Sequence, residues 1–311
     1  MRNAVLDQIR EIIQRDVNNR GLARDPHENL FTACRDDLAN ACRSIAETPQ
    51  PVLLIVTGFF IPHAQPPCGE TDGPLGALFL ARAGQALGIE VALLTDDFCG
   101  RALEIGLKAC DLNKTVPVLV APAVSLILPE RTHLVALERV GPGFDNRCHN
   151  MHGRDITEEM APLHRFFDPA YQTPPIPTIG IGDGGNEIGM GKISPEVIAR
   201  NIANGERIAC RVPTDHLIVA GVSNWGAYAL AAGVAVLRRQ RLPASLFDVE
   251  RERELLRIMV EQGPLVDGVT AQPAVTVDGL AFDDYAEPLQ QIGELLEKAQ
   301  CLTYEERPGP K

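Results

Sequence analysis

The chain alternates between short apolar runs and longer segments whose apolar residues recur every three or four positions. Two segments with helical spacing come first, at residues 5–17 and 29–46. Strands are then predicted at residues 52–57, 90–94, 134–138, 176–181 and 217–222, with an extended stretch from residue 116, and helices at residues 75–87, 100–108, 195–203, 224–239, 248–261 and 288–299. Several predicted strands are apolar throughout, which is typical of strands buried on both faces of a parallel sheet.

This alternation predicts an α/β fold, with a mainly parallel β-sheet covered by helices on both faces in a Rossmann-like, three-layer arrangement. The two extra N-terminal helices form an extension at residues 1–48. No convincing linker interrupts the pattern, and 45% of the residues are hydrophobic, so residues 1–311 are expected to form one domain with a sizeable core. The tail at residues 304–311, which contains two prolines, is expected to be loose.

Charge and cysteine content narrow the class of protein. The chain has 29 basic and 41 acidic residues and a net charge of −12, which disfavours nucleic acid and anionic membranes as partners. Its eight cysteines show no zinc-type spacing, and a reducing compartment is the simplest reading. The N-terminus lacks a signal-peptide core, and the longest apolar run, residues 116–128, is short and contains two prolines. We therefore expect a cytoplasmic protein that does not span a membrane.

The most informative segment is the glycine-rich run at residues 178–192, TIGIGDGGNEIGMGK. It follows a predicted strand and leads towards a helix, and ligands bind where strands hand over to helices in an open α/β sheet. Asp183, Asn186 and Glu187 give the run side chains that can bind ions. A glycine-rich turn that only packs a helix against a strand would explain the glycines, but not these three polar residues together.

Nucleotide-binding motifs fit this run poorly. Gly180, Gly182 and Gly185 satisfy G-x-G-x-x-G, but no acidic residue ends a strand about 20 positions later, and two carboxylates would face the pyrophosphate. Lys192 is followed by Ile193 rather than serine or threonine, which excludes a phosphate loop of the G-K-[ST] type.

Other predicted strands end in similar chemistry. Polar residues stand at strand ends or beside glycines at Glu70, Asp72, Glu138, Ser223, Asn224 and Asp267. Each has an ordinary alternative role: Asp72, Ser223 and Asn224 as helix caps, and Glu138 as solvated surface. Because the ends of parallel strands meet at one edge of a sheet, several of these side chains are expected to share a pocket.

Clustered carboxylates resist ionisation unless a cation neutralises them. Oxygen ligands suit a hard divalent ion such as magnesium, manganese or calcium. The candidate ligands are Glu70, Asp72, Asp183 and Asp267. His149 and His152 are three residues apart in a predicted loop, which favours substrate contact or a structural role over zinc binding.

Five segments, TGFFI…GETDGPLGA, ERVGP…CHNMHGRDIT, GIGDGGNEIGMGK, VSNWGAYAL and VDGVT, resemble the D-glutamate cyclase family, specifically its C-terminal cyclase-like domain. The resemblance covers nearly the whole chain from about residue 53 to residue 299. It implies a hydro-lyase that converts D-glutamate to 5-oxo-D-proline and water. Larger mitochondrial members carry an additional N-terminal domain.

The resemblance implies roles for particular residues. The substrate amine must be neutral to attack the γ-carboxyl carbon, and Glu187 or Glu138 could be the base. A divalent ion held by Asp183, Asp72 or Glu70 would polarise the carboxyl group. Arg139, Arg154 or Lys192, the last also counted among the catalytic candidates, could hold the α-carboxylate. The remaining substrate-binding candidates are His149, Asn150, Asn186, Ser223 and Asn224.

Two other functions stay open at this point. An acidic, metal-binding pocket could hydrolyse a phosphate ester or an amide. Alternatively, the glycine-rich run could belong to a non-catalytic sensor of a small molecule or dinucleotide. The expected partner is a small amino acid substrate, and the sequence is compatible with a homo-oligomer.

Overall fold

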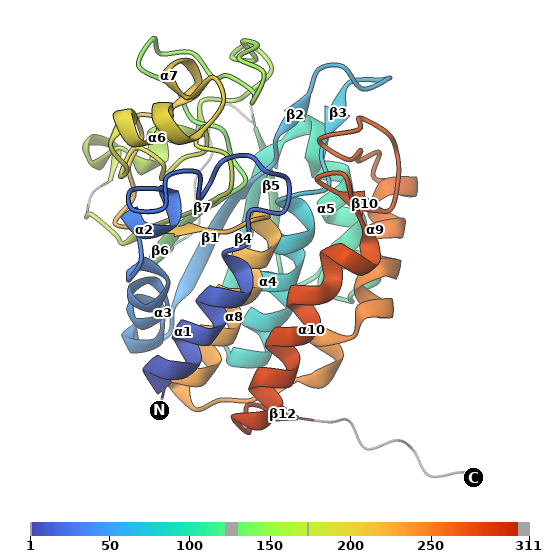
Figure 1. The fold of residues 1–311 in the computed structure, drawn as a ribbon. Helices are drawn as coiled ribbons and strands as arrows, with labels where there is room; N and C mark the ends of the chain where they lie inside the picture. Colours follow the sequence, from blue (N-terminus) through green and yellow to red (C-terminus); the bar gives the residue numbers. More distant parts are fainter. Residues whose placement is uncertain (1, 122–129, 173, 304–311) are drawn as a thin grey trace.

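A computed structural model describes residues 2–121, 130–172 and 174–303 (Figure 1). Its main sheet has six strands, β1 (Val52–Thr57), β4 (Glu90–Asp96), β5 (Val118–Ala121), β6 (His133–Leu137), β7 (Thr178–Gly182) and β8 (His216–Val219). All the pairings are parallel, and the order is β5-β4-β1-β6-β7-β8. From β1 the chain adds β4 and then β5 on one side, and it then adds β6, β7 and β8 in turn on the other side. The topological switch point therefore lies between β1 and β6, where doubly wound sheets bind ligands.

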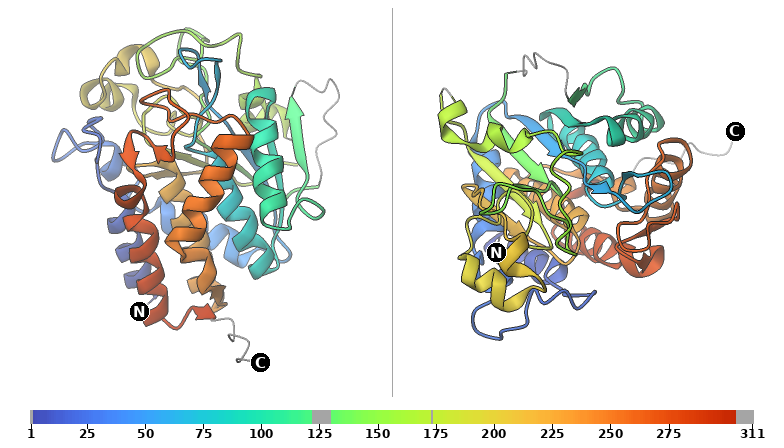
Figure 2. Two further views of the ribbon diagram at one scale, coloured as in Figure 1. Left: turned by 90° about the vertical axis from the view of Figure 1, so that its right-hand side faces the viewer. Right: turned by 90° about the horizontal axis from the view of Figure 1, so that it is seen from above.

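Helices cover the two faces of the sheet unequally. On one face, the helices α3 (Asp37–Glu47), α4 (Pro74–Leu87), α5 (Asp97–Ala109) and α8 (Ser223–Arg238) pack against the strands. The helices α1 (Arg2–Ile13), α9 (Val249–Gln262) and α10 (Phe282–Lys298) pack against these helices on the same side. The other face is covered by loops and by the short helices α2 (Leu30–Ala33), η1 (Leu163–Phe167), α6 (Pro195–Asn201) and α7 (Gly205–Ile208). The predicted three-layer α/β fold is confirmed (Figure 2).

The central strands are buried on both faces, as their apolar sequences predict. In β1, Leu53 and Ile55 pack into the core under the long helices, whereas Leu54 and Val56 pack into the core on the opposite face. All four side chains are at most 4% exposed. This double burial explains why β1 reads as one continuous apolar run rather than as an alternation.

Two short hairpins lie beside the carboxyl end of the sheet. The hairpin of β2 (Phe60–Ile61) and β3 (Cys68–Gly69) and the hairpin of β10 (Thr276–Val277) and β11 (Leu280–Ala281) lie near this end (Figure 1). The remaining short elements are η2 (Pro169–Tyr171), η3 (Ala244–Phe247), β9 (Leu242–Pro243) and β12 (Leu302–Thr303).

The largest differences from the prediction concern three helices. The helix predicted at residues 5–17 ends at Ile13. The one predicted at residues 29–46 is split into α2 and α3, because the backbone leaves the helical conformation at Cys34 (φ −128°, ψ 37°). Helix α10 begins at Phe282 rather than at Pro288, which lies inside it. Residues 122–128 of the predicted extended stretch and the tail at 304–311 lie outside the described residues. Across the described ranges, no helix is long and apolar enough to cross a membrane.

Candidate active site

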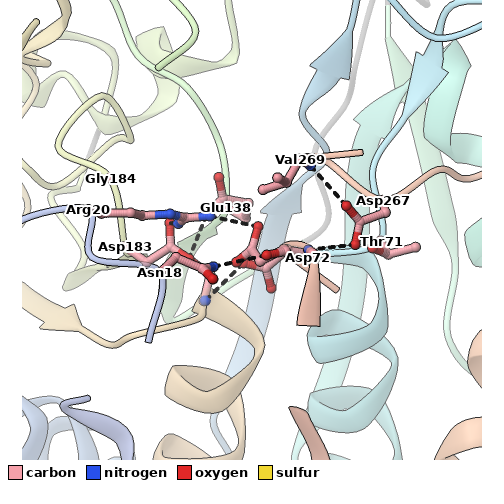
Figure 3. A network of polar contacts seen from close by, with 12 residues as sticks. Asn18, Arg20, Thr71, Asp72, Glu138, Asp183, Gly184, Asp267 and Val269 are labelled. Atoms are coloured by element: carbon pink, nitrogen blue, oxygen red, sulfur yellow. Dashed lines mark hydrogen bonds and ion pairs between the residues drawn. The ribbon is translucent and has the colours of Figure 1, made fainter. Parts of the chain in front are cut away.

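Three carboxylates meet at the switch point of the sheet (Figure 3). Glu138 directly follows β6, Asp183 directly follows β7, and Asp72 lies two residues before α4. One oxygen from each lies within 4.8 Å of the others, and each residue is at most 6% exposed. It is the one group of three potential metal ligands found in the described part of the chain.

Asp72 and Asn224 hold the N-terminal ends of α4 and α8 together, because Asp72 caps α8 and Asn224 caps α4. The Asp72 carboxylate accepts hydrogen bonds from the backbone N–H groups of Ser223 (2.9 Å) and Asn224 (2.8 Å), in the first turn of α8. In return, the Asn224 Oδ1 atom accepts from the backbone N–H groups of Gly73 (2.9 Å) and Gly76 (2.7 Å), at the start of α4. Backbone N–H groups that have no partner within their own helix are thereby satisfied at the N-terminal ends of both helices.

Glu187 shapes the glycine-rich run. Its carboxylate accepts hydrogen bonds from the backbone N–H groups of Asp183 (2.8 Å), Gly184 (2.5 Å) and Gly185 (2.7 Å). Gly185 has a φ of +101°, a conformation that side chains rarely adopt. At Gly180, a Cβ atom would lie 2.7 Å from the carbonyl oxygen of Ile188, so the run must pack closely on itself. This geometry holds Asp183 at the end of β7.

Burial and mutual repulsion raise the pKa of the three carboxyl groups at the switch point. Burial raises the pKa of Asp72 to about 7, with a further contribution from Asp278. Burial also raises the pKa of Glu138, and the Glu187 and Asp72 carboxylates raise it further. The pKa of Asp183 is raised chiefly by burial, although Arg20 opposes the shift. In the absence of a cation, such a group of carboxylates favours protonation.

These donors fit a divalent cation. The Oδ2 atom of Asp183 is buried without a hydrogen-bond partner among the described residues. It belongs to a group of three carboxylates whose oxygen atoms already lie close together. An all-oxygen ligand set suits magnesium, manganese or calcium rather than zinc or copper. The residues that would hold the ion are Asp72, Glu138 and Asp183.

A cavity of about 240 Å³ opens onto this group. Its lining consists of Arg20, Phe59, Ile61, His63, Glu70, Glu138, Asn150, Met151, His152, Asp183, Asn186, Glu187, Gly268, Val269 and Asp278. Larger hollows occur elsewhere, for example one of about 1060 Å³ beside Val52 and Glu90 at the amino ends of the strands. The smaller cavity has Glu138 and Asp183 of the three-carboxylate group in its lining, so it is the candidate active site.

Comparison with known proteins matches this chain to a family. A family model described as "D-glutamate cyclase-like, C-terminal" matches residues 9–293. The chain belongs to the D-glutamate cyclase-like family. It is 32% identical over 323 aligned residues to the human protein "D-glutamate cyclase, mitochondrial", an alignment that covers 92% of this chain and 51% of the human protein. The chain thus spans about half the length of that curated relative.

Many of the residues predicted for a D-glutamate cyclase-like site line the cavity. Those that do are Glu70, Glu138, Asn150, Asp183, Asn186 and Glu187. Ser223 lies behind Glu138 and donates a hydrogen bond of 2.5 Å to its Oε2 atom. The two asparagines also shape the wall, because Asn186 donates to the carbonyl of His149 (2.8 Å) and Asn150 accepts from the backbone N–H of Arg154 (3.0 Å).

The cationic residues predicted to hold a substrate carboxylate do not line the cavity. Lys192 pairs with Asp37 at 2.5 Å and donates to the carbonyl of Asp215 at 2.6 Å. Arg139 is 1% exposed, pairs with Asp96, and donates to the carbonyl oxygens of Gly58 (3.1 Å) and Ala161 (2.7 Å). These contacts tie neighbouring strand ends and loops together. Arg154 is exposed outside the cavity.

Two further predicted residues organise loops beside the cavity. Asp267 accepts hydrogen bonds from the backbone N–H groups of Val269 (3.0 Å), Thr270 (2.8 Å) and Gly279 (2.7 Å). This arrangement holds the β10–β11 hairpin close to the site. The Nε2 atom of His149 lies 2.8 Å from the Asp145 carboxylate, and the side chain is 2% exposed.

Sequence reasoning missed Arg20 and Asp278. Arg20 pairs with Asp183 and, at 2.7 Å, with Asp278. Burial alone would lower the pKa of Arg20, but the neighbouring carboxylates, Asp183 first, raise it above its ordinary value. The Asp-Gly dipeptide at Asp278 signals a tight hairpin turn, with φ values of +56° and +76°. Neither this signal nor the polar loop around Arg20 indicates that the side chains reach the site.

Proposed function

We propose that this chain is an enzyme of the D-glutamate cyclase type, which converts D-glutamate to 5-oxo-D-proline and water. Family membership supports the reaction class, and the buried group of Asp72, Glu138 and Asp183 beside a small cavity carries the assignment to this site. In the reaction the amine nitrogen forms a bond to the γ-carboxyl carbon, and one oxygen of that carboxyl group leaves as water. The cavity volume of about 240 Å³ is below the usual range of about 300–1,000 Å³ for ligand pockets, which favours a small amino acid over a dinucleotide.

A divalent cation held by Asp72, Glu138 and Asp183 would make the γ-carboxyl group a better electrophile and assist the departure of its oxygen. Hydrogen bonds within the protein orient two of these carboxylates. Asp72 is held by the first turn of α8, and Glu138 by the Ser223 hydroxyl group. Carboxylates that are oriented by the protein in this way need less reorganisation during catalysis.

Glu70 is the carboxylate best placed to accept a proton from the substrate ammonium group. Glu187, an earlier candidate for the base, is held by three backbone N–H groups, and Glu138 belongs to the proposed cation site. Glu70 lines the cavity outside that site, and burial, followed by Asp278 and Asp72, raises its pKa. A raised pKa brings a carboxylate closer to the range in which it accepts a proton effectively near neutral pH.

Turnover of D-glutamate tests the proposal. Purified protein, freed of metal and then supplied with Mn²⁺ or Mg²⁺, is incubated with D-glutamate, and 5-oxo-D-proline is followed by NMR. L-Glutamate and D-aspartate serve as control substrates, since the latter would have to close a strained four-membered ring. Formation of 5-oxo-D-proline only with a divalent ion is the expected result. No product from D-glutamate under any metal condition would refute the proposed activity.

A further inference from the structure

Arg20 is the cationic feature of the cavity. It lies between α1 and α2, in a segment that passes over the carboxyl end of the sheet, and Figure 3 shows its side chain beside Asp183 and Glu138. Among the described residues it is the one arginine or lysine in the cavity lining. Its side chain is 15% exposed, so the guanidinium group remains accessible from the cavity.

The segment around Arg20 is held in one shape before any ligand binds. The Asp16 carboxylate accepts hydrogen bonds from the backbone N–H groups of Arg20 (2.8 Å) and Gly21 (2.9 Å). Gly21 has a φ of +101°, and a Cβ atom there would collide with the carbonyl oxygen of Asn201. The Asn201 side chain also accepts from the backbone N–H of Asp25 at 2.8 Å. The segment is thus fastened to α6.

The Arg20 guanidinium group pairs with two carboxylates and retains N–H donors for a further ligand. Its two terminal nitrogens pair with Asp183 and Asp278, and Asn18 donates to the backbone carbonyl of Asp278 at 2.9 Å. A guanidinium group has five N–H donors in a planar fork, and these two ion pairs need only two of them. The fork matches the geometry of a carboxylate.

We propose that Arg20 binds the α-carboxylate of the substrate, which makes it the anchor that selects an anionic amino acid. This inference rests on the proposed function. A cavity lined by Glu70, Glu138, Asp183, Glu187 and Asp278 repels a dicarboxylate, so each substrate carboxylate needs a cation. The cation site beside Asp183 would serve the carboxyl group that reacts, and Arg20 serves the one that does not.

The arginine variants Arg20→Gln and Arg20→Lys test this role. A charge-assisted contact of about 1.5–3 kcal/mol corresponds to a change of about 10- to 100-fold. We expect the KM for D-glutamate to rise by this factor in Arg20→Gln with a smaller change in kcat, and Arg20→Lys to recover part of the loss. Mn²⁺ affinity, measured by calorimetry without substrate, is expected to be unchanged or higher, because a positive charge has been removed.

Arg15→Gln is the matched control. Arg15 lies in the same segment and pairs with Glu287 at 2.9 Å, but it does not line the cavity. Its KM is expected to equal that of the parent protein. If Arg20→Gln does not fold, Asp278→Asn replaces it. Asparagine tolerates the φ of +56° at this position, and loss of the Asp278 charge removes a carboxylate that competes with the substrate for Arg20. A KM decrease of several-fold is expected for that variant, and an unchanged KM would count against the anchor role.

The outcomes separate the inference from the proposed function. If the parent protein forms 5-oxo-D-proline and Arg20→Gln keeps the parent KM, the inference is overturned and the function stands. A large loss of Mn²⁺ affinity in Arg20→Gln would also overturn it, because Arg20 would then act by positioning Asp183. If the parent protein does not turn over D-glutamate, calorimetry with glutarate decides: binding that Arg20→Gln abolishes supports the anchor, and equal or absent binding overturns it.

Discussion

The buried carboxylates of this site have different roles, because each one accepts hydrogen bonds from a different set of protein groups. Glu187 accepts three backbone N–H groups, and Asp72 caps the first turn of α8. Glu138 is held by one hydroxyl group, whereas Asp183 keeps one buried oxygen without a partner among the described residues. Asp183 is therefore the carboxylate most available to a cation, whereas backbone N–H groups already bind both Asp72 and Glu187.

Replacing Glu70 with glutamine tests its role as the base. The variant removes the proton acceptor but keeps the volume of the side chain and the proposed cation ligands. We expect kcat to fall by about 10²-fold or more, the usual range for loss of a general base, while Mn²⁺ affinity stays close to that of the parent protein. Glu90→Gln, at the exposed start of β4, is the control. Unchanged kcat in Glu70→Gln would assign the base elsewhere.

At the scale of elements, the site depends on the contact between α4 and α8. Gly76 lies in the first turn of α4, and its backbone N–H donates to the Asn224 side chain across the helix interface. The Asn224 side chain is fully buried, so no water can replace this acceptor. The two helix ends consequently form a single support for Asp72.

Asn224→Ala is therefore expected to destabilise the protein. An unsatisfied buried N–H group costs about 1–3 kcal/mol, so the free energy of unfolding should fall by about 2 kcal/mol in chemical denaturation. The control is Asn3→Ala, at an exposed position of α1. If both variants unfold at the same denaturant concentration as the parent protein, the reciprocal capping does not stabilise the site.

Strand β6 carries a buried histidine that makes the fold sensitive to acid. His133 lies between the hydroxyl groups of Ser44 (3.1 Å) and Thr132 (2.8 Å), and burial lowers its pKa from 6.5 to about 4. Between pH 6.5 and 4 the unfolded chain therefore binds a proton that the folded protein does not. The contribution of His133 to stability is complete above pH 6.5 and is lost as the pH falls towards 4.

Thermal unfolding of the parent protein and of His133→Gln at several pH values measures this effect. Glutamine does not titrate, so the parent protein should lose stability relative to the variant as the pH is lowered from 7 to 4.5. For His27→Gln, at an exposed position, the difference in stability from the parent protein should stay constant over the same pH range. A stability difference between parent and His133→Gln that stays constant with pH would contradict the buried, neutral state of His133.

At the scale of the whole molecule, segments far apart in the sequence meet at the switch point. Arg20 comes from the N-terminal loop, Glu138 and Asp183 from the ends of central strands, and Asp278 from a hairpin near the C-terminus. The candidate active site therefore requires both halves of the sheet, the loop between α1 and α2, and the β10–β11 hairpin to be folded. The single domain, the cytoplasmic location and the homo-oligomer stay predictions.

Much of this architecture could be predicted from the sequence, for identifiable reasons. The strand boundaries of β1 follow from an uninterrupted apolar run, and the clustering of Glu138 with Asp183 follows from the convergence of parallel strand ends. The partners of Asp72 could not be predicted, because it caps α8 and not only the helix that follows it. Arg20 could not be found at all, because loop conformation, rather than any periodic pattern, brings it to the site.

A calorimetric titration with Mn²⁺ tests whether Asp72, Glu138 and Asp183, the carboxylates at the switch point, form a cation site. Mn²⁺ is added to metal-free parent protein and to Asp183→Asn, which keeps the shape of the side chain but lacks its charge. We expect saturable binding to the parent protein and at least tenfold weaker binding to the variant. Equal Mn²⁺ affinity in the two proteins, or no binding to either, would contradict this expectation.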